Sequence, residues 1–199
     1  GQCDYTSVVD LDLSQVEVIK GVASSLYGAS ALGGVVNLVS RKPGAAAEQE
    51  MLVNQTSQGQ TNALMWLDGP MTGRWGYTFL GGVDRQSKHD VDEDGWADVA
   101  GFQRVSLRPR VSWDNGAGRS LFFTVGVMGE DRRGGTMGGH VVPDATTCLE
   151  ALDTRRVDLG LVSRWVVGGT RVASFRGSLM RQQHRHVFGP ATGHDVHQV

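Results

Sequence analysis

The sequence lacks any apolar run of about 18 residues, the length that a membrane-spanning helix needs. Proline is scarce, with 5 of 199 residues, and the formal net charge is only −2. A charge so close to zero gives no overall field that would attract nucleic acid or an anionic membrane surface, so we expect no nucleic-acid partner. The two cysteines, Cys3 and Cys148, lie far apart without metal-binding spacing, so we expect neither a disulfide framework nor a zinc site.

Glycine, by contrast, is abundant, with 28 of 199 residues against an average share of about 7%. Because proline is scarce, this excess is typical of a glycine-rich all-β protein rather than of collagen or a low-complexity chain. The first residues, Gly1–Asp4, include no Met and have none of the features of a signal peptide, and the last residues show no stop pattern. We therefore expect the chain to be a fragment cut at both ends.

Alternation of apolar and polar residues predicts β-strands in much of the chain. The pattern is clearest from Arg104 to Trp113, where every odd residue is apolar and every even residue is Arg or Ser. Five such segments are each about ten residues long, the length that crosses an outer membrane at a tilt. A weaker hairpin at Val53–Gln58 and Asn62–Asp68 raises the expected number to about seven strands. The five segments are Trp75–Arg85, Arg104–Trp113, Leu121–Glu130, Val157–Val167 and Val172–Gln182.

The connections between these segments alternate between short and long, as in a barrel with short periplasmic turns and long outer loops. Trp75, Trp113 and Trp165 each lie beside a short connection and on the apolar face of their segment. This placement predicts half of an aromatic girdle at one membrane interface. The short connections are Asp114–Arg119 and Gly168–Thr170, and the long ones are Gln86–Gly101 and Asp131–Arg155.

A soluble β-sandwich or jelly roll would also alternate, and it is the main competing fold class. Its loops, however, do not usually alternate between short and long with tryptophan on the short side alone. The polar faces are also rich in arginine, which suits a water-filled lumen. We therefore predict an all-β fold, a partial transmembrane antiparallel β-barrel whose odd, open set of strands cannot close within this chain.

Residues 14–43 read SQVEVIKGVASSLYGASALGGVVNLVSRKP and closely resemble the end of the plug domain in TonB-dependent outer-membrane receptors. The rest of the chain resembles the family more loosely. The resemblance implies that residues 1–44 are the C-terminal part of a plug domain and that residues 45–199 are the first strands of a barrel of about 22 strands. The motif residues, with a structural role, are Gly21, Leu26, Tyr27, Gly28, Gly33, Gly34 and Asn37.

The resemblance also implies a function, namely energised uptake of a scarce large nutrient through the bacterial outer membrane. The expected cargo is a ferric siderophore, with cobalamin, haem or an oligosaccharide as alternatives. The expected partners are the TonB–ExbB–ExbD complex, the extracellular ligand and outer-membrane lipids. A passive porin or an adhesin would share the barrel pattern but should lack the plug motif. Because no catalytic constellation stands out, we expect no enzymatic activity.

A cluster of carboxylates lies in the first long connection. Asp90, Asp92 and Asp94, followed by Gly95, match the opening of a calcium-binding loop, because hard cations take clustered carboxylate oxygens. The closing Glu is absent, since Gly101 stands at that position. The alternatives are a calcium site in an outer loop and a solvated acidic loop, and no other cofactor is expected.

Several basic residues are candidates for ligand binding. Alternation places Arg104 and Arg108 in the lumen, where they could attract an anionic siderophore or could hydrogen-bond acidic groups of the plug. His184 and His186 lie two apart on the same face, and His140 follows a glycine-rich run in the longest loop. Histidines in such positions could hold a metal or haem iron, or could be ordinary polar surface.

Overall fold

The computed structural model describes residues 13–20, 34–138, 147–190 and 195–198, which form two antiparallel β-sheets. Among these described residues, no helix is long and apolar enough to cross a membrane. One sheet has two strands and the other has eight. The strands are β1 (Leu13–Lys20), β2 (Gly34–Ser40), β3 (Glu48–Gln55), β4 (Gln60–Pro70), β5 (Trp75–Gln86), β6 (Gly101–Asp114), β7 (Arg119–Gly135), β8 (Cys148–Val167), β9 (Arg171–Pro190) and β10 (Asp195–Gln198).

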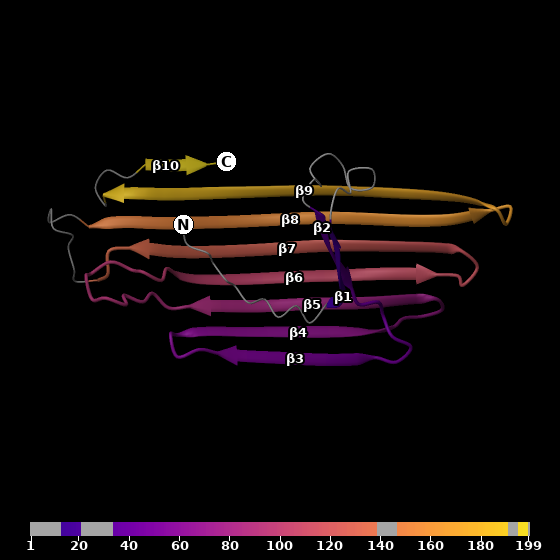
Figure 1. Cartoon of the computed structure of the whole chain (residues 1–199), viewed down its shortest axis with the longest axis horizontal. Helices are drawn as coiled ribbons and strands as arrows, with labels where there is room; N and C mark the ends of the chain where they lie inside the picture. The colour runs from indigo at the N-terminus through magenta and orange to yellow at the C-terminus, as the bar shows by residue number, and fades with distance from the viewer. Residues whose placement is uncertain (1–12, 21–33, 139–146, 191–194, 199) are drawn as a thin grey trace.

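The large sheet is a simple meander in which each strand pairs with the strands before and after it in the chain (Figure 1). Its order runs from β3 to β10 without a crossover, and its two edge strands are open within the described residues. The prediction of an all-β antiparallel fold is confirmed. The sheet has eight strands, where the sequence pattern predicts about seven.

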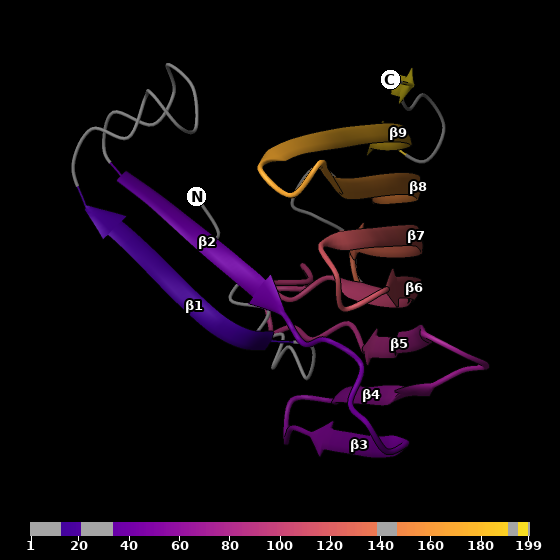
Figure 2. The ribbon, with the colours of Figure 1, turned by 90° about the vertical axis from the view of Figure 1, so that its right-hand side faces the viewer.

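The small sheet is the strand pair expected in the motif of residues 14–43. β1 and β2 pair antiparallel, with Val18 opposite Val36 and Glu17 opposite Asn37. Gly34 begins β2 with a φ of 117°, a left-handed value that favours glycine. The pair extends away from one face of the large sheet (Figure 2). The other motif residues, Gly21, Leu26, Tyr27, Gly28 and Gly33, lie outside the described residues.

The two faces of the large sheet follow residue parity, because each register from β4 to β9 pairs odd with odd residues and even with even. We call the face with the even-numbered side chains the inner face. Pro43, between the two sheets, lies over this face, since a Cβ at Gly76 would come within 2.8 Å of its ring. Trp75 and Trp113 lie opposite each other on the outer face. The assignment of faces from alternation is therefore confirmed.

From β4 to β9, the connections are also sorted by length between the two ends of the sheet, whereas the short turn 56–59, between β3 and β4, lies at the end of the long connections. Three short turns, 71–74, 115–118 and 168–170, lie at one end, and the long connections 87–100 and 136–147 lie at the other. The second long connection is shorter than predicted, because β7 and β8 continue as strands of 17 and 20 residues beyond the alternating segments. The short-turn end is the periplasmic end in a barrel of this kind.

The first hairpin of the sheet differs from its prediction. β3 ends at Gln55, whereas the sequence pattern extended that strand to Gln58. Residues 56–59 instead form the turn, in which the amide of Thr56 donates to the carbonyl of Gln60 at 2.9 Å. Gly59 adopts a φ of 80° there, a value that a turn needs and that glycine supplies without strain.

A small apolar cluster lies on the inner face of the first strands. Trp66 is 1% exposed and Leu64 is 7% exposed. Leu52 from β3 and Leu80 from β5 pack against them. Because apolar side chains on an inner wall need cover from water, this cluster indicates that another segment lies over β4.

Candidate functional site

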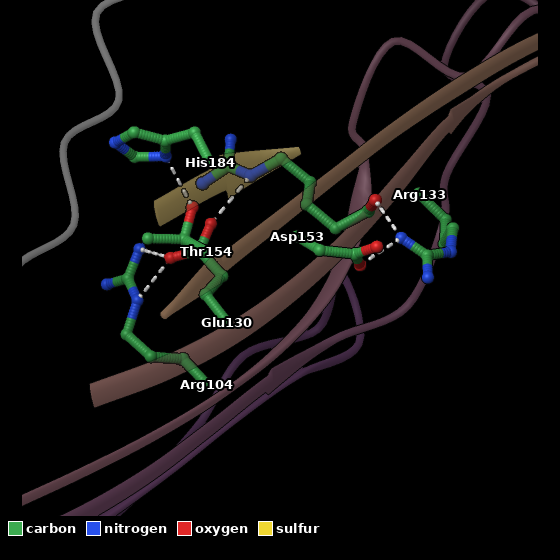
Figure 3. A network of polar contacts seen from close by, with 7 residues as sticks. Arg104, Glu130, Arg133, Asp153, Thr154 and His184 are labelled. Atoms are coloured by element: carbon green, nitrogen blue, oxygen red, sulfur yellow. Dashed lines mark hydrogen bonds and ion pairs between the residues drawn. The ribbon is translucent and has the colours of Figure 1, made fainter. Parts of the chain in front are cut away.

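A row of polar side chains crosses the inner face near the end with the long connections (Figure 3). The registers place Arg104 opposite Glu130, and Glu130 opposite Thr154. Thr154 in turn lies opposite His184, so residues far apart in the sequence share one line across the sheet. The whole row, from β4 to β9, consists of Asn62, Asp84, Arg104, Glu130, Thr154 and His184.

Arg104, one of the two arginines expected in the lumen, pairs with a carboxylate of the sheet itself. Its Nη2 atom lies 2.6 Å from Oε2 of Glu130, whose side chain is 8% exposed. Nε of Arg132 lies 3.0 Å from the other oxygen of Glu130. Both guanidinium groups also lie over the ring of Phe102, at 5.4 Å for Arg104 and 5.2 Å for Arg132. These contacts, all within the large sheet, fix the position of Arg104.

Arg108 reaches from β6 across β7 to a carboxylate on β8. Its Nη1 and Nη2 atoms donate to the two oxygens of Asp158 at 2.9 and 3.2 Å, a bidentate geometry. The reach is open because Gly126, opposite Asp158 on β7, has no side chain. A Cβ at Gly126 would lie 2.5 Å from Oδ1 of Asp158 and 2.7 Å from Nη2 of Arg108. The glycine therefore makes room for this ion pair.

The histidine candidates lie on the inner face of β9, but the structure gives them partners within the sheet. Nδ1 of His184 lies 2.9 Å from Oγ1 of Thr154, and its Nε2 contacts the amide nitrogen of Gln182. The ring of His186 lies 6.3 Å from that of Phe188. Neither ring nitrogen of His184 is therefore free of a protein contact. His140 lies outside the described residues.

The segment 41–47, between the two sheets, is attached to the inner face of β4 near the short-turn end. The amide of Gly44 donates to Oδ2 of Asp68 at 2.8 Å, and Asp68 is 3% exposed. The guanidinium carbon of Arg41 lies 6.0 Å from the centre of the Trp66 ring. This segment is therefore the cover that the apolar cluster needs, and no pattern in the sequence predicts the contact.

The outer face carries the aromatic residues expected at a membrane interface. The rings of Trp75 and Trp113 lie 6.4 Å apart near the short turns. Trp165 lies at the same end, with the guanidinium carbon of Arg119 at 5.6 Å from its ring. The predicted half-girdle at the short-turn end is therefore present on the outer face.

The acidic connection between β5 and β6 gathers different carboxylates from those expected. Ligand oxygens of Asp90, Asp92 and Asp98 lie within 4.8 Å of one another. Asp94 instead accepts a hydrogen bond from the amide of Trp96 at 2.8 Å. Loss of hydration raises the pKa of Asp92, and the nearby carboxylates add to the effect. Calcium binding by this loop stays a prediction, with Asp98 as the carboxylate that the sequence motif did not indicate.

Comparison with known proteins gives several relatives, although no family model matches the chain. The metal-pseudopaline receptor CntO of Pseudomonas aeruginosa is 30% identical over 58% of this chain and 16% of its own length. The ferrioxamine B receptor of Salmonella typhimurium is 41% identical over 30% of this chain and 8% of its own. The iron-regulated outer membrane virulence protein of Vibrio cholerae is 25% identical over 60% of this chain and 19% of its own. The chain therefore spans less than a fifth of each of these three relatives.

Solved structures give the same architecture. One of them is a mutant of the ferric enterobactin receptor PfeA of Pseudomonas aeruginosa in complex with enterobactin. The superposition covers 88% of this chain and 28% of the PfeA chain. The TM-score is 0.57 and the identity 20%, so this likeness bears on the fold alone. Two of these relatives are named as receptors and the third as an outer-membrane protein, and none is named as an enzyme. The chain is part of an outer-membrane protein, and it resembles the TonB-dependent receptors in sequence and in fold.

Proposed function

We propose that the receptor containing this chain imports a ferric siderophore. The observation that carries this proposal is the set of ligands in the names of its relatives, which are metal-pseudopaline, ferric enterobactin and ferrioxamine B. These ligands share one chemistry, since each is a metal chelate too large for simple diffusion through a narrow pore. Cobalamin, haem and an oligosaccharide are the alternative cargoes within the same family.

The inner face supports this proposal through its unused hydrogen-bond donors. A guanidinium group has five N–H donors, and the ion pairs with Glu130 and Asp158 use only part of those of Arg104 and Arg108. The remaining donors can bind oxygen atoms of an anionic chelate while the carboxylates hold each arginine in place. We propose Arg104, Arg108, His184 and His186 as wall contacts on the ligand's route, with His140 as a loop contact.

We further propose that uptake is energised by the TonB–ExbB–ExbD complex acting on the plug. The attachment of segment 41–47 to Asp68 supports this proposal, because a pulled plug needs a fixed point on the barrel wall. A passive porin or an adhesin, the alternatives from another class, would work without energy coupling. Dependence on TonB therefore separates these classes.

The test is uptake of radiolabelled iron by iron-starved cells of the source bacterium. Cells lacking the gene are compared with complemented cells, with and without TonB, using ferrioxamine B and ferric enterobactin as separate substrates. We expect complementation to restore uptake of one chelate only when TonB is present. If the cells took up neither chelate but showed TonB-dependent uptake of cobalamin or haem, that compound would be the cargo instead. Equal uptake without TonB would contradict an energised transporter.

We also propose calcium as the cation of the acidic loop. Calorimetric titration of calcium into the full-length receptor is expected to give a binding signal that is lost in the double variant Asp92→Asn/Asp98→Asn. Asp114→Asn is the matched control, because Asp114 caps a short turn at the other end of the sheet. An unchanged signal in the double variant would show that the acidic loop is solvated and does not bind calcium.

A further inference from the structure

The turn of residues 115–118 joins β6 to β7 at the short-turn end of the sheet, and it begins with an asparagine directly before a glycine (Figure 1). In such a pair, the backbone nitrogen of Gly116 can attack the side-chain carbonyl carbon, Cγ, of Asn115, because the chain itself holds the two atoms close together. Gly116 is exposed, has a φ of 70°, and has no atom within 4 Å of the position of a Cβ. The attacking nitrogen is therefore not shielded by neighbouring side chains.

A carboxylate lies on this attacking nitrogen. The amide of Gly116 donates to Oδ1 of Asp114 at 2.7 Å. A carboxylate in this position can accept the proton of the amide while the nitrogen attacks, which is the role of a general base. The nucleophile and its base are thus already in hydrogen-bond contact.

Two backbone amides lie on the oxygen that would become negative. Oδ1 of Asn115 accepts hydrogen bonds from the amides of Ala117 and Arg119, each at 2.9 Å. Both partners are donors, so the oxygen of the side-chain amide, and not its nitrogen, must face them. Attack on Cγ moves charge onto Oδ1, and the two N–H groups stabilise this charge as an oxyanion hole does. Nδ2 of Asn115 donates no hydrogen bond to another residue in the described part of the chain, so it can leave into water.

We propose that this turn modifies itself by deamidation of Asn115, with Asp114 as the base. A bond forms between the Gly116 nitrogen and Cγ of Asn115, and the bond between Cγ and Nδ2 breaks. The proton of the Gly116 amide passes through Asp114 to Nδ2, which departs as ammonia and leaves a cyclic imide. Water then opens the imide to aspartate or isoaspartate, so the reaction needs no oxidant or reductant. Each chain reacts once, which makes this a self-modification and not an enzymatic turnover.

The two products have different consequences for the turn. The carboxylate of the aspartate product can accept from the same two amides, and a charged acceptor binds them more strongly. The isoaspartate product lengthens the backbone by a methylene group and displaces the hydrogen bond from the Asn115 amide to the Arg119 carbonyl, which is 3.0 Å long. Either product adds a negative charge at the short-turn end, the periplasmic end in a barrel of this kind. The proposal is independent of the cargo and of energy coupling.

The test measures the rate of deamidation in the purified full-length receptor, incubated in detergent at neutral pH. Trypsin, which cleaves after Arg110 and Arg119, releases residues 111–119 as one peptide, and mass spectrometry follows its deamidation. The reference is a synthetic peptide of the same residues, which contains the same Asn–Gly pair without the fold. We expect the reaction to be about a hundredfold faster in the receptor, the lower end of what a positioned general base contributes.

The variant Asp114→Ser tests the base, because a hydroxyl oxygen can still accept from the Gly116 amide but is not a base at neutral pH. Each variant is compared with a peptide that carries the same substitution, so that only the effect of the fold is measured. Asp94→Ser is the matched control, since Asp94 accepts from the amide of Trp96 at 2.8 Å across the same spacing of two residues. The ratio of the receptor rate to the peptide rate should fall about tenfold or more in Asp114→Ser and stay unchanged in Asp94→Ser.

Two results would overturn the proposal. A receptor that reacts no faster than its peptide would show that the fold does not activate the Asn–Gly pair. An equal fall of the ratio in Asp114→Ser and Asp94→Ser would show that the carboxylate on the Gly116 nitrogen has no special role. Asn54, which is exposed on β3 but precedes Gln55, is the internal reference and is expected to stay intact over the same period. A heat-dependent gel shift in every variant verifies that the barrel has folded.

Discussion

The inner face of the large sheet carries a covered apolar cluster at β3–β5, whereas at β6–β9 it carries charged side chains in ion pairs. In the first region, Trp66 and Leu64 are almost fully buried, and the segment 41–47 lies over them. In the second region, Arg104 and Arg108 form ion pairs with carboxylates from the next strands. The same barrel wall therefore changes its chemistry within a few strands.

This difference reflects what each part of the wall faces. The first strands hold a segment of the chain itself, so burial of apolar surface stabilises the contact. The later strands face water and, in our proposal, the cargo, so their polar groups are paired with one another and keep donors for a ligand. The register, rather than the local sequence, brings these pairs together. Each region can be tested by a substitution that spares the other.

The largest effect is expected from removing the buried aromatic side chain of the first region. Trp66→Ala should destabilise the full-length receptor by about 3–5 kcal/mol, because it leaves a cavity below segment 41–47. The melting temperature of the purified receptor in detergent measures this change. Trp75→Ala is the control, since Trp75 lies on the outer face and is 41% exposed. Equal losses in both variants would show that the inner cluster has no special role.

A smaller effect is expected from filling the gap below the ion pair of the second region. Gly126→Ala places a Cβ 2.5 Å from Oδ1 of Asp158, so the pair between Arg108 and Asp158 must separate. We expect a loss of about 2 kcal/mol, typical of overpacking at a close contact. Gly129→Ala on the same strand is the control, because no atom lies within 4 Å of a Cβ there. A stable Gly126→Ala variant would indicate that the ion pair tolerates displacement.

A still smaller effect is expected from removing the attachment of segment 41–47 to the large sheet. Asp68→Ala removes the acceptor of the Gly44 amide and should cost about 1 kcal/mol locally. We expect faster hydrogen exchange at residues 41–47, with little change in the strands. Asp114→Ala is the control, because it removes an exposed acceptor of a backbone amide, that of Gly116. Unchanged exchange in Asp68→Ala would mean that packing on Trp66 alone holds the segment.

The sequence predicted the faces of the sheet correctly but not the pairs formed on them. Alternation placed Trp75 and Arg104 on opposite faces, because a strand period of two is a local property. The pair of Arg108 with Asp158 is 50 residues apart in sequence and depends on the registers of two strand pairings, which no local pattern fixes.

The lengths of the later strands could also not be predicted from the sequence. β7, for example, continues through Asp131 to Gly135, where polar residues occupy both faces. Above the apolar belt, both faces of a strand meet water or headgroups, so alternation no longer marks the strand. In the acidic loop, a motif of carboxylates close together in sequence could likewise not show that Asp98, and not Asp94, lies beside Asp90 and Asp92.

The smallest predicted effect concerns the connection between the two regions, residues 87–100. This loop is attached to the later strands, since the amide of Ala97 donates to the carbonyl of Gly135 at 3.1 Å. The raised pKa of Asp92 means that the folded loop favours the protonated carboxyl group. The resulting contribution to the stability of the folded loop is fully present below the ordinary pKa of an aspartate. It is lost as the pH rises through the raised pKa.

Hydrogen exchange in this loop should therefore slow as the pH is lowered from 7 to 4, after correction for the intrinsic exchange rate. The amide of Gly95, which donates to Oδ2 of Asp90 at 2.9 Å, is the most direct reporter. Asp92→Asn should remove the pH dependence, because an amide does not titrate, while the exchange in β5 and β6 stays the same. A pH dependence that survives in Asp92→Asn would assign the effect to another carboxylate of the cluster.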